Sequence, residues 1–251
     1  IFRNPQPEST PASGGLVDAH DQLIDAATVL RARLLDAVGA DAADPTPVAT
    51  VTGKDASVAL RIEYRRQLVA IAVQDLLAED PVQIQPVVGV WLSDLATATL
   101  EAALAVSRAE TQTRHADVND VELTVIAMGK CGARELNYFS DVDVIFAHDV
   151  AQDSGLTHQA ATDIAVELAA GISTVVNQPA REPALWEVDT NLRPEGQDGV
   201  LSRTVSSHLE YYQRWAHTWE FQALLKARPV AGSLDLGQRY LDAVSPLVWQ
   251  A

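Results

Sequence analysis

The chain has 251 residues, of which 34 are acidic and 18 basic, for a net charge of −16, and 47% are apolar. This length suits one large or two small globular domains. Proteins that bind a nucleic-acid backbone usually carry a basic patch, so the acidic balance argues against nucleic acid as a partner. No apolar run approaches 18 residues, so we expect no membrane span.

The first and last residues of the chain and its single cysteine indicate the extent and the cellular location of the protein. The chain begins with Ile1, shows no signal peptide and stops just after a mostly apolar run, so we expect it to be a piece of a longer protein. Cys131 is the only cysteine. A disulfide within the chain is therefore impossible, and a cytoplasmic location is expected. We expect Cys131 to be a small buried residue and not a nucleophile.

The first part of the chain is predicted to be helical after a flexible arm over 1–15, which is rich in Pro, Ser and Gly. Within the helical region 16–118, apolar residues recur at helical spacing over 16–38, 55–79 and 88–111. Asp55 and Ser57 are candidate caps of the second helix. Solvent exposure is expected for the charged run Arg61, Glu63, Arg65 and Arg66.

From residue 119 the pattern changes to short apolar runs bounded by polar residues, which indicates buried strands. Strands are predicted over 123–128, 141–148 and 184–192, and helices over 156–176, 205–227 and 234–244. The expected fold is α+β: a core of mixed sheet with flanking helices over 119–203, followed by a truncated helical segment over 204–251. A core position is expected for the four aromatic residues Tyr211, Tyr212, Trp215 and Trp219.

The most informative stretch is 125–146, VIAMGKCGARELNYFSDVDVIF. It predicts a strand, a Gly-containing turn, a short helix and a second strand. Asp141 and Asp143 share a face of that second strand because side chains alternate along it. Two adjacent carboxylates repel each other unless a hard cation lies between them. The stretch therefore predicts metal-dependent nucleotidyl chemistry.

The turn before the aspartates is a candidate phosphate site. Gly129 and Gly132 allow close approach of the backbone to a ligand, and a helix from about Ala133 would direct its free N–H groups at the turn. Lys130 and Arg134 add positive charge. Ser140, like Asn137, suits either a purely structural role between helix and strand or a place in the site.

Two-metal phosphoryl chemistry generally needs a third carboxylate, and the later predicted strand offers Glu187 and Asp189 on one face. Asp189 is favoured because it sits at the strand end close to Arg193, and Glu187 is the alternative. Arg193 suits a phosphate or a nucleotide, but it is also compatible with a salt bridge to Glu195 or Asp198.

The run GKCGARELNYFSDVDVIF resembles the nucleotidyltransferase signature of the glutamine synthetase adenylyltransferase/adenylyl-removing enzymes. The runs WEVDTNLRPEGQDGVLSR and EYYQRWAHTWEFQALLKARPVAG resemble the same family, so the likeness covers about 121–232 in three ordered segments. It implies a DNA-polymerase-β-like nucleotidyltransferase core. It also implies Mg²⁺, two ions being the expected number, on Asp141, Asp143 and Asp189. The nucleotide and inorganic phosphate would then be held by Gly129, Lys130, Gly132, Arg134, Ser140 and Arg193.

Members of that family carry two such domains, one transferring AMP from ATP to a tyrosine of glutamine synthetase and one removing it by phosphorolysis. The sequence around Asn137 resembles that of the N-terminal, adenylyl-removing half. The resemblance thus implies glutamine synthetase as protein substrate, ADP as product, and the PII signalling protein and glutamine as regulators. Forward AMP transfer from ATP is the alternative.

Two further functions remain open. A uridylyltransferase of the PII protein also has a Gly turn and an Asp-x-Asp, but we would expect a His-Asp pair downstream, and His20-Asp21 and His148-Asp149 do not follow the core. A degenerate domain that only binds a regulator is the second, although all three carboxylates are present. A nucleic-acid polymerase is disfavoured by the net charge.

Overall fold

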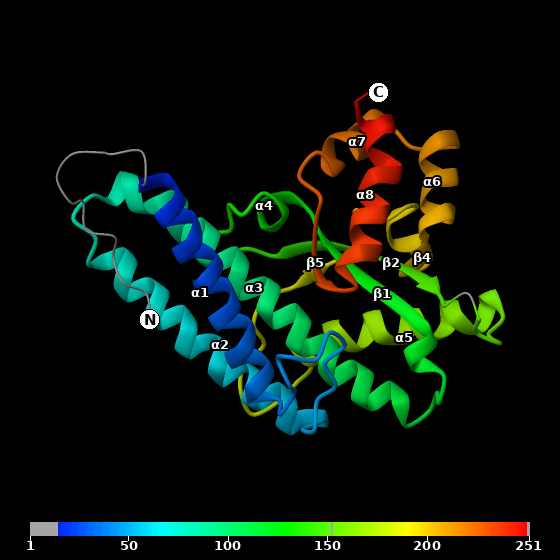
Figure 1. Ribbon diagram of the computed structural model, residues 1–251, viewed down its shortest axis with the longest axis horizontal. Helices are drawn as coiled ribbons and strands as arrows, with labels where there is room; N and C mark the ends of the chain where they lie inside the picture. The colour runs from blue at the N-terminus through cyan, green and yellow to red at the C-terminus, as the bar shows by residue number, and fades with distance from the viewer. Residues whose placement is uncertain (1–14, 152, 250–251) are drawn as a thin grey trace.

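The structure, a computed structural model, describes residues 15–151 and 153–249. The expected arm over 1–15 lies outside the described residues except for Gly15, which begins the first helix. A five-stranded mixed sheet is flanked by helices, which confirms the predicted α+β class. In Figure 1 the long N-terminal helices lie on one side of the sheet and the C-terminal helices on the other.

Three long helices precede the sheet: α1 (Gly15–Ala37), α2 (Gly53–Leu76) and α3 (Pro81–Gln112). Helix α3 begins seven residues before the predicted start at 88. The Asp80 side chain caps it by accepting hydrogen bonds from the N–H groups of Val82 and Gln83. Pro81 follows at a position that needs no N–H partner, and Pro86 lies inside the helix without ending it.

Helix α2 differs from its prediction in two ways. It begins at Gly53, so neither Asp55 nor Ser57 caps it. The charged run is not a solvated face, because Arg61 is fully buried and Glu63 is also buried. Arg66 is exposed as expected. A charged side chain can be buried where the surrounding structure provides hydrogen-bond partners, and sequence spacing alone does not reveal such partners.

Within the described residues the strands are β1 (Val121–Ala127), β2 (Val142–Val150), β3 (Val188–Asp189), β4 (Ser202–Thr204) and β5 (Arg228–Gly232). Antiparallel partners β2 and β5 flank β1. Both β3 and β4 pair with β2 in parallel, β3 at its beginning and β4 further along. Strands β4 and β5 were not predicted, and β3 has two residues where nine were expected. The sheet therefore draws its β5 edge from the stretch between the helices predicted over 205–227 and 234–244.

The remaining helices are α4 (Gly129–Gly132), α5 (His158–Asn177), α6 (Val205–Arg214), α7 (Thr218–Leu224) and α8 (Leu234–Val248), with 3₁₀ turns over Val118–Asp120 and Gly196–Asp198. The helix predicted over 205–227 is thus two shorter helices, α6 and α7. Tyr212 is buried as expected, but Trp215 and Trp219 are 70% and 52% exposed, so their assignment to the core is wrong.

Alternation along β1 and β2 divides the interior into two cores. Val125 and Phe146 face the larger core, which lies against α3 and α5, and the N-terminal helices continue it. Ile126 and Ile145 face the smaller core, which is covered by α6, α7 and α8. Since both faces of the sheet are buried, the positions of these strands are set from two sides.

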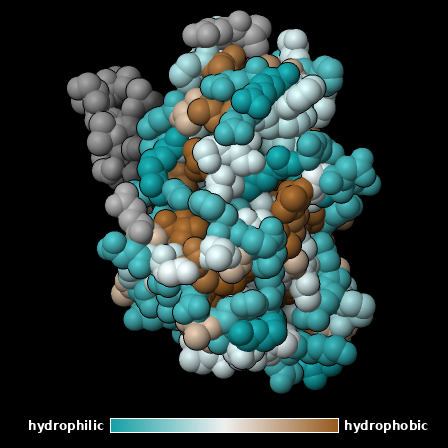
Figure 2. All heavy atoms as spheres, turned by 90° about the vertical axis from the view of Figure 1, so that its right-hand side faces the viewer, coloured by the Kyte–Doolittle hydropathy of each residue, from teal (hydrophilic) through white to brown (hydrophobic). Residues whose placement is uncertain are grey.

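Helix α3 is long and apolar enough to cross a membrane by length and composition, which the sequence analysis did not expect. Within the structure, however, 83% of its most apolar window is buried, as in the core helix of a soluble domain. The face of the molecule on the right of Figure 1 is mainly hydrophilic, with apolar side chains in a few separate areas (Figure 2). Helix α3 is therefore a core helix of this fold.

Two buried histidines join β2 to its surroundings. The Nδ1 atom of His148 lies 3.0 Å from the Ser202 hydroxyl of β4, and Nε2 of His208 donates to the Phe146 carbonyl oxygen at 3.2 Å. Burial lowers the pKa of each histidine to about 4. Both rings are therefore neutral in the folded protein near neutral pH.

We expect this pair to make the fold acid-sensitive. Between about pH 6.5 and pH 4 the unfolded chain binds protons that folded His148 and His208 exclude, so the free energy of unfolding falls as the pH drops through this window. Each histidine contributes up to roughly 1.4 kcal/mol per pH unit. Urea unfolding of His148→Gln at pH 7.5 and 5.5 should show a smaller loss than wild type, and the exposed His158→Gln should show the wild-type loss. An unchanged loss in His148→Gln would contradict the assignment.

Candidate metal centre

Three carboxylates meet where β2 and β3 begin to run side by side. Asp141 stands just before β2, Asp143 is its second residue, and Asp189 is the last residue of β3. The parallel pairing sets Asp143 opposite Asp189. One carboxylate oxygen from each of the three lies within 4.8 Å of the others. The structure thus brings together the three aspartates singled out from the sequence.

The electrostatics of this cluster suit a cation. Partial burial, together with the negative charges of Asp141 and Asp189, raises the pKa of Asp143, while Lys130 acts in the opposite direction. The three carboxylates repel one another, and a hard divalent ion with oxygen ligands removes that repulsion. The donor set and its spacing therefore fit Mg²⁺.

Main-chain hydrogen bonds fix the cluster. The Val142 N–H donates to the Glu187 carbonyl oxygen at 2.9 Å, which joins the two strand starts. The Asn191 N–H donates to Oδ1 of Asp189 at 2.7 Å and orients that carboxylate. The Ser140 hydroxyl donates to Oδ1 of Asp141 at 3.4 Å. Glu187, the alternative third carboxylate, is exposed and contributes its carbonyl, not its side chain.

Gly129 lies directly against the cluster. Its φ is +50°, and a Cβ atom at this position would lie 2.5 Å from Oδ2 of Asp143. Both the backbone conformation and the contact therefore require glycine. Gly132 has a different role, because a Cβ there would lie 2.0 Å from the Lys226 carbonyl oxygen. It allows close packing of the chain against that carbonyl.

The helix expected from about Ala133 is absent. The helical turn is α4, only four residues long, and the chain leaves it through Arg134 at a φ of +60°. Arg134 does not point to the carboxylates: its guanidinium forms an ion pair with the buried Asp94 of α3 at 2.5 Å. The predicted phosphate site built from helix N–H groups and Arg134 is therefore not supported.

The other two predicted cations differ in availability. Arg193 donates four hydrogen bonds within its own loop, to the carbonyl and hydroxyl of Thr190 and to the carbonyls of Gln197 and Gly199. It closes that loop and forms neither of the salt bridges considered for it. Lys130 is exposed and has no ion-pair partner among the side chains that the structure describes, so it is the cation best placed for an incoming anion.

Arg228 was not identified from the sequence, because it lies in the short stretch between two predicted helices and no strand was expected there. It is the first residue of β5, and its guanidinium donates to the carbonyl oxygens of Cys131 at 3.0 Å and Gly132 at 3.1 Å. These bonds hold α4 and hence the turn at Gly129. Cys131 is buried, which raises the pKa of its thiol to about 11 and confirms the expectation of a small structural residue.

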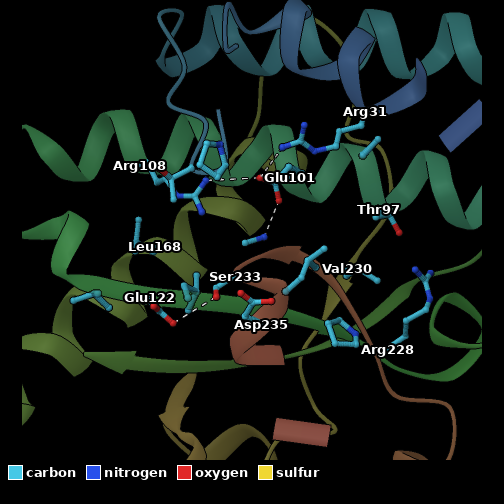
Figure 3. Close-up of a pocket in the computed structure, with 18 of the residues that line it drawn as sticks. Arg31, Thr97, Glu101, Arg108, Glu122, Leu168, Arg228, Val230, Ser233 and Asp235 are labelled. Carbon is cyan, nitrogen blue, oxygen red and sulfur yellow. Dashed lines mark hydrogen bonds and ion pairs between the residues drawn. The ribbon is translucent and has the colours of Figure 1, made fainter. Parts of the chain in front are cut away.

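A cavity of about 700 Å³ lies elsewhere, between α1 and α3 on one side and β5 with the start of α8 on the other. Figure 3 shows Arg31 and Arg108 reaching the buried Glu101 from two directions, each at 3.8 Å. Glu101 also accepts a hydrogen bond from the Gly232 N–H at 2.7 Å. These contacts join the helices to the sheet. None of the three aspartates lines this cavity, so we place the functional site at the carboxylates, where the charges are unpaired.

The fold and the site together indicate a class of protein. It is an α+β domain with a three-carboxylate centre of the kind that holds divalent metal for phosphoryl or nucleotidyl chemistry. A model of the glutamate-ammonia ligase adenylyltransferase family matches residues 17–243. The chain belongs to that family.

Curated relatives agree. A protein from Bifidobacterium longum subsp. infantis is 50% identical over 96% of this chain, and one from Leifsonia xyli subsp. xyli is 51% identical over 90%. One from Streptomyces coelicolor is 51% identical over 77%. Each is named a bifunctional glutamine synthetase adenylyltransferase/adenylyl-removing enzyme. The chain spans about a fifth of their length, 22%, 22% and 19% respectively.

We expect Gly129→Ala to weaken Mg²⁺ binding by about 10-fold or more, since the added methyl group displaces the Asp143 carboxylate. The matched control is Gly53→Ala, which imposes similar backbone strain at a φ of +64° but has no atom within 4 Å of the new Cβ. Isothermal titration with Mg²⁺ should show wild-type affinity in the control. Equal affinities in all three proteins would show that Gly129 does not shape the site.

Proposed function

We propose that this protein is a Mg²⁺-dependent nucleotidyltransferase domain of DNA-polymerase-β-like fold that removes AMP from the adenylylated tyrosine of glutamine synthetase. The observation that carries the proposal is the cluster of Asp141, Asp143 and Asp189, with oxygens within 4.8 Å, in a chain of this family. The relatives' name includes both transfer and removal of the adenylyl group.

The residues divide the work. Asp141, Asp143 and Asp189 would hold Mg²⁺, two ions being the expected number. Bound there, Mg²⁺ supplies positive charge to the phosphate oxygens of both reactants. Lys130, exposed beside Asp143, would hold the incoming phosphate. Gly129 keeps the turn close to Asp143, and Arg193 keeps the loop after Asp189 closed.

The proposed reaction is an in-line displacement at the α-phosphorus of the adenylyl group. An oxygen of inorganic phosphate forms the new P–O bond, the bond to the tyrosine oxygen breaks, and the products are ADP and tyrosine, whose phenolate takes a proton from water. Phosphate is already an anionic nucleophile and phenolate a tolerable leaving group. Positioning and charge neutralisation therefore supply most of the catalysis, and a general base is unnecessary.

Glutamine synthetase would be the protein substrate, with the PII protein and glutamine as regulators of the whole enzyme. We expect the domain to act in the cytoplasm, in keeping with its single buried cysteine. Nucleic acid is an unsuitable partner for a surface with a net charge of −16. Forward transfer of AMP from ATP would use the same three carboxylates, and it is the alternative.

The test is the formation of ADP from adenylylated glutamine synthetase, Mg²⁺ and phosphate. We expect Asp143→Asn to lower the rate roughly 100-fold or more, since it removes a charge that holds the metal. Asp163→Asn, the same change at an exposed site on α5, should leave the rate unchanged. A wild-type rate in Asp143→Asn would show the metal-centre assignment to be wrong.

The same preparation decides the direction of transfer. Wild-type protein that moves AMP from ATP to unmodified glutamine synthetase, and forms no ADP in the phosphate reaction, would favour the forward alternative. Loss of both activities in Asp143→Asn would show that one centre serves either direction.

A further inference from the structure

Helix α2 contacts the chain on both approaches to the carboxylate cluster. We propose that α2 is a strut that holds Asp189 close to Asp141 and Asp143, with Arg65 and Tyr138 as positioning residues. This proposal rests on the metal centre of the proposed function. It assigns a role to α2, which supplies none of the three carboxylates.

Arg61 ties α2 to the end of α5. Its fully buried guanidinium donates to the carbonyl oxygens of Val175 at 2.9 Å, Gln178 at 2.8 Å and Glu182 at 2.9 Å. Carbonyls at the end of a helix lack helical partners and carry partial negative charge, so a buried cation stabilises them. The chain that leaves α5 is therefore attached to α2 before it turns toward β3.

A second set of contacts lies one helical turn further along α2. Arg65 donates to two successive carbonyls, those of Pro183 at 2.7 Å and Ala184 at 3.2 Å. Next to it, Tyr64 packs edge-on against Trp186, with ring centroids 6.5 Å apart. Residues three and four apart share a helix face, so α2 presents one continuous surface to this segment.

The segment between these α2 contacts and the third carboxylate, Asp189, is short. Asp189 follows Trp186 by three residues, at most about 10 Å of extended chain. Strand β3 itself has only two residues, Val188 and Asp189, and so small a pairing gives little stability alone. Asp189 and Asp143 also repel each other. The contacts of α2 oppose the separation that this repulsion favours.

The far end of α2 holds the other half of the site. The Tyr138 hydroxyl donates to Oδ2 of Asp75 at 2.9 Å, and Asp141 follows Tyr138 by three residues. Asp75 lies 14 residues after Arg61, about 21 Å along the helix axis. One rigid element therefore sets where both strands enter the cluster.

The test compares Mn²⁺ affinity, measured by electron paramagnetic resonance, with the melting temperature of the metal-free protein. We expect Arg65→Gln and Tyr138→Phe each to weaken Mn²⁺ binding by about 10-fold while the melting temperature changes little. Arg65→Lys, which keeps a donor for one carbonyl, should restore part of the affinity. The matched control is Arg66→Gln, because Arg66 is exposed and, among the residues that the structure describes, its ion-pair partner is Glu63 on its own helix.

The possible results distinguish a failure of the α2 proposal from a failure of the proposed metal centre. Wild-type Mn²⁺ affinity in Arg65→Gln and Tyr138→Phe, with affinity lost in Asp189→Asn, would overturn the strut and leave the metal centre standing. Retained affinity in Asp189→Asn would overturn the metal centre and the strut together. Equal losses of Mn²⁺ affinity in Arg66→Gln and Arg65→Gln would also overturn the proposal. The loss would then result from removing a positive charge and not from removing the hydrogen bonds of Arg65.

Discussion

Mutual repulsion among three carboxylates is the constraint on which the rest of this structure depends. Asp141, Asp143 and Asp189 offer oxygens within 4.8 Å of one another, and the raised pKa of Asp143 reflects its partial burial together with that crowding. Such a cluster separates unless the backbone beneath it is held firmly. The parallel pairing of β2 with β3 and the glycine at 129 supply part of that support.

The remaining support comes from elements far from the cluster in sequence. The sheet is packed on both faces, with separate cores against the N-terminal and the C-terminal helices. Arg228 reaches back to α4 from the last strand, and Arg61 reaches from α2 to the end of α5. Both arginines use carbonyl oxygens as partners. The fold thus uses a buried guanidinium group, that of Arg61, and a partly buried one, that of Arg228, to hold irregular backbone, a task that suits their several fixed donors.

The sequence allowed prediction of the parts governed by local pattern. Strand β2 and its aspartates followed from alternation, and Cys131 was expected to be buried because cysteine behaves as a small hydrophobe. The parts governed by tertiary partners could not be predicted. Arg134 was assigned to an anion by its position near the turn, yet it pairs with Asp94 of α3. Strand β5 was missed because pairing with β1, not its own composition, makes it a strand.

The contact between Gly132 and the chain around Lys226 has a consequence for the order of folding. The turn beside the carboxylates packs against backbone that is synthesised more than 90 residues later, and Arg228 bonds to it across separations of 96 and 97 residues. During synthesis from the N-terminus, strands β1 and β2 can pair as soon as both have emerged. The turn between them must wait for β5. The metal centre therefore cannot be completed before β5 has been synthesised.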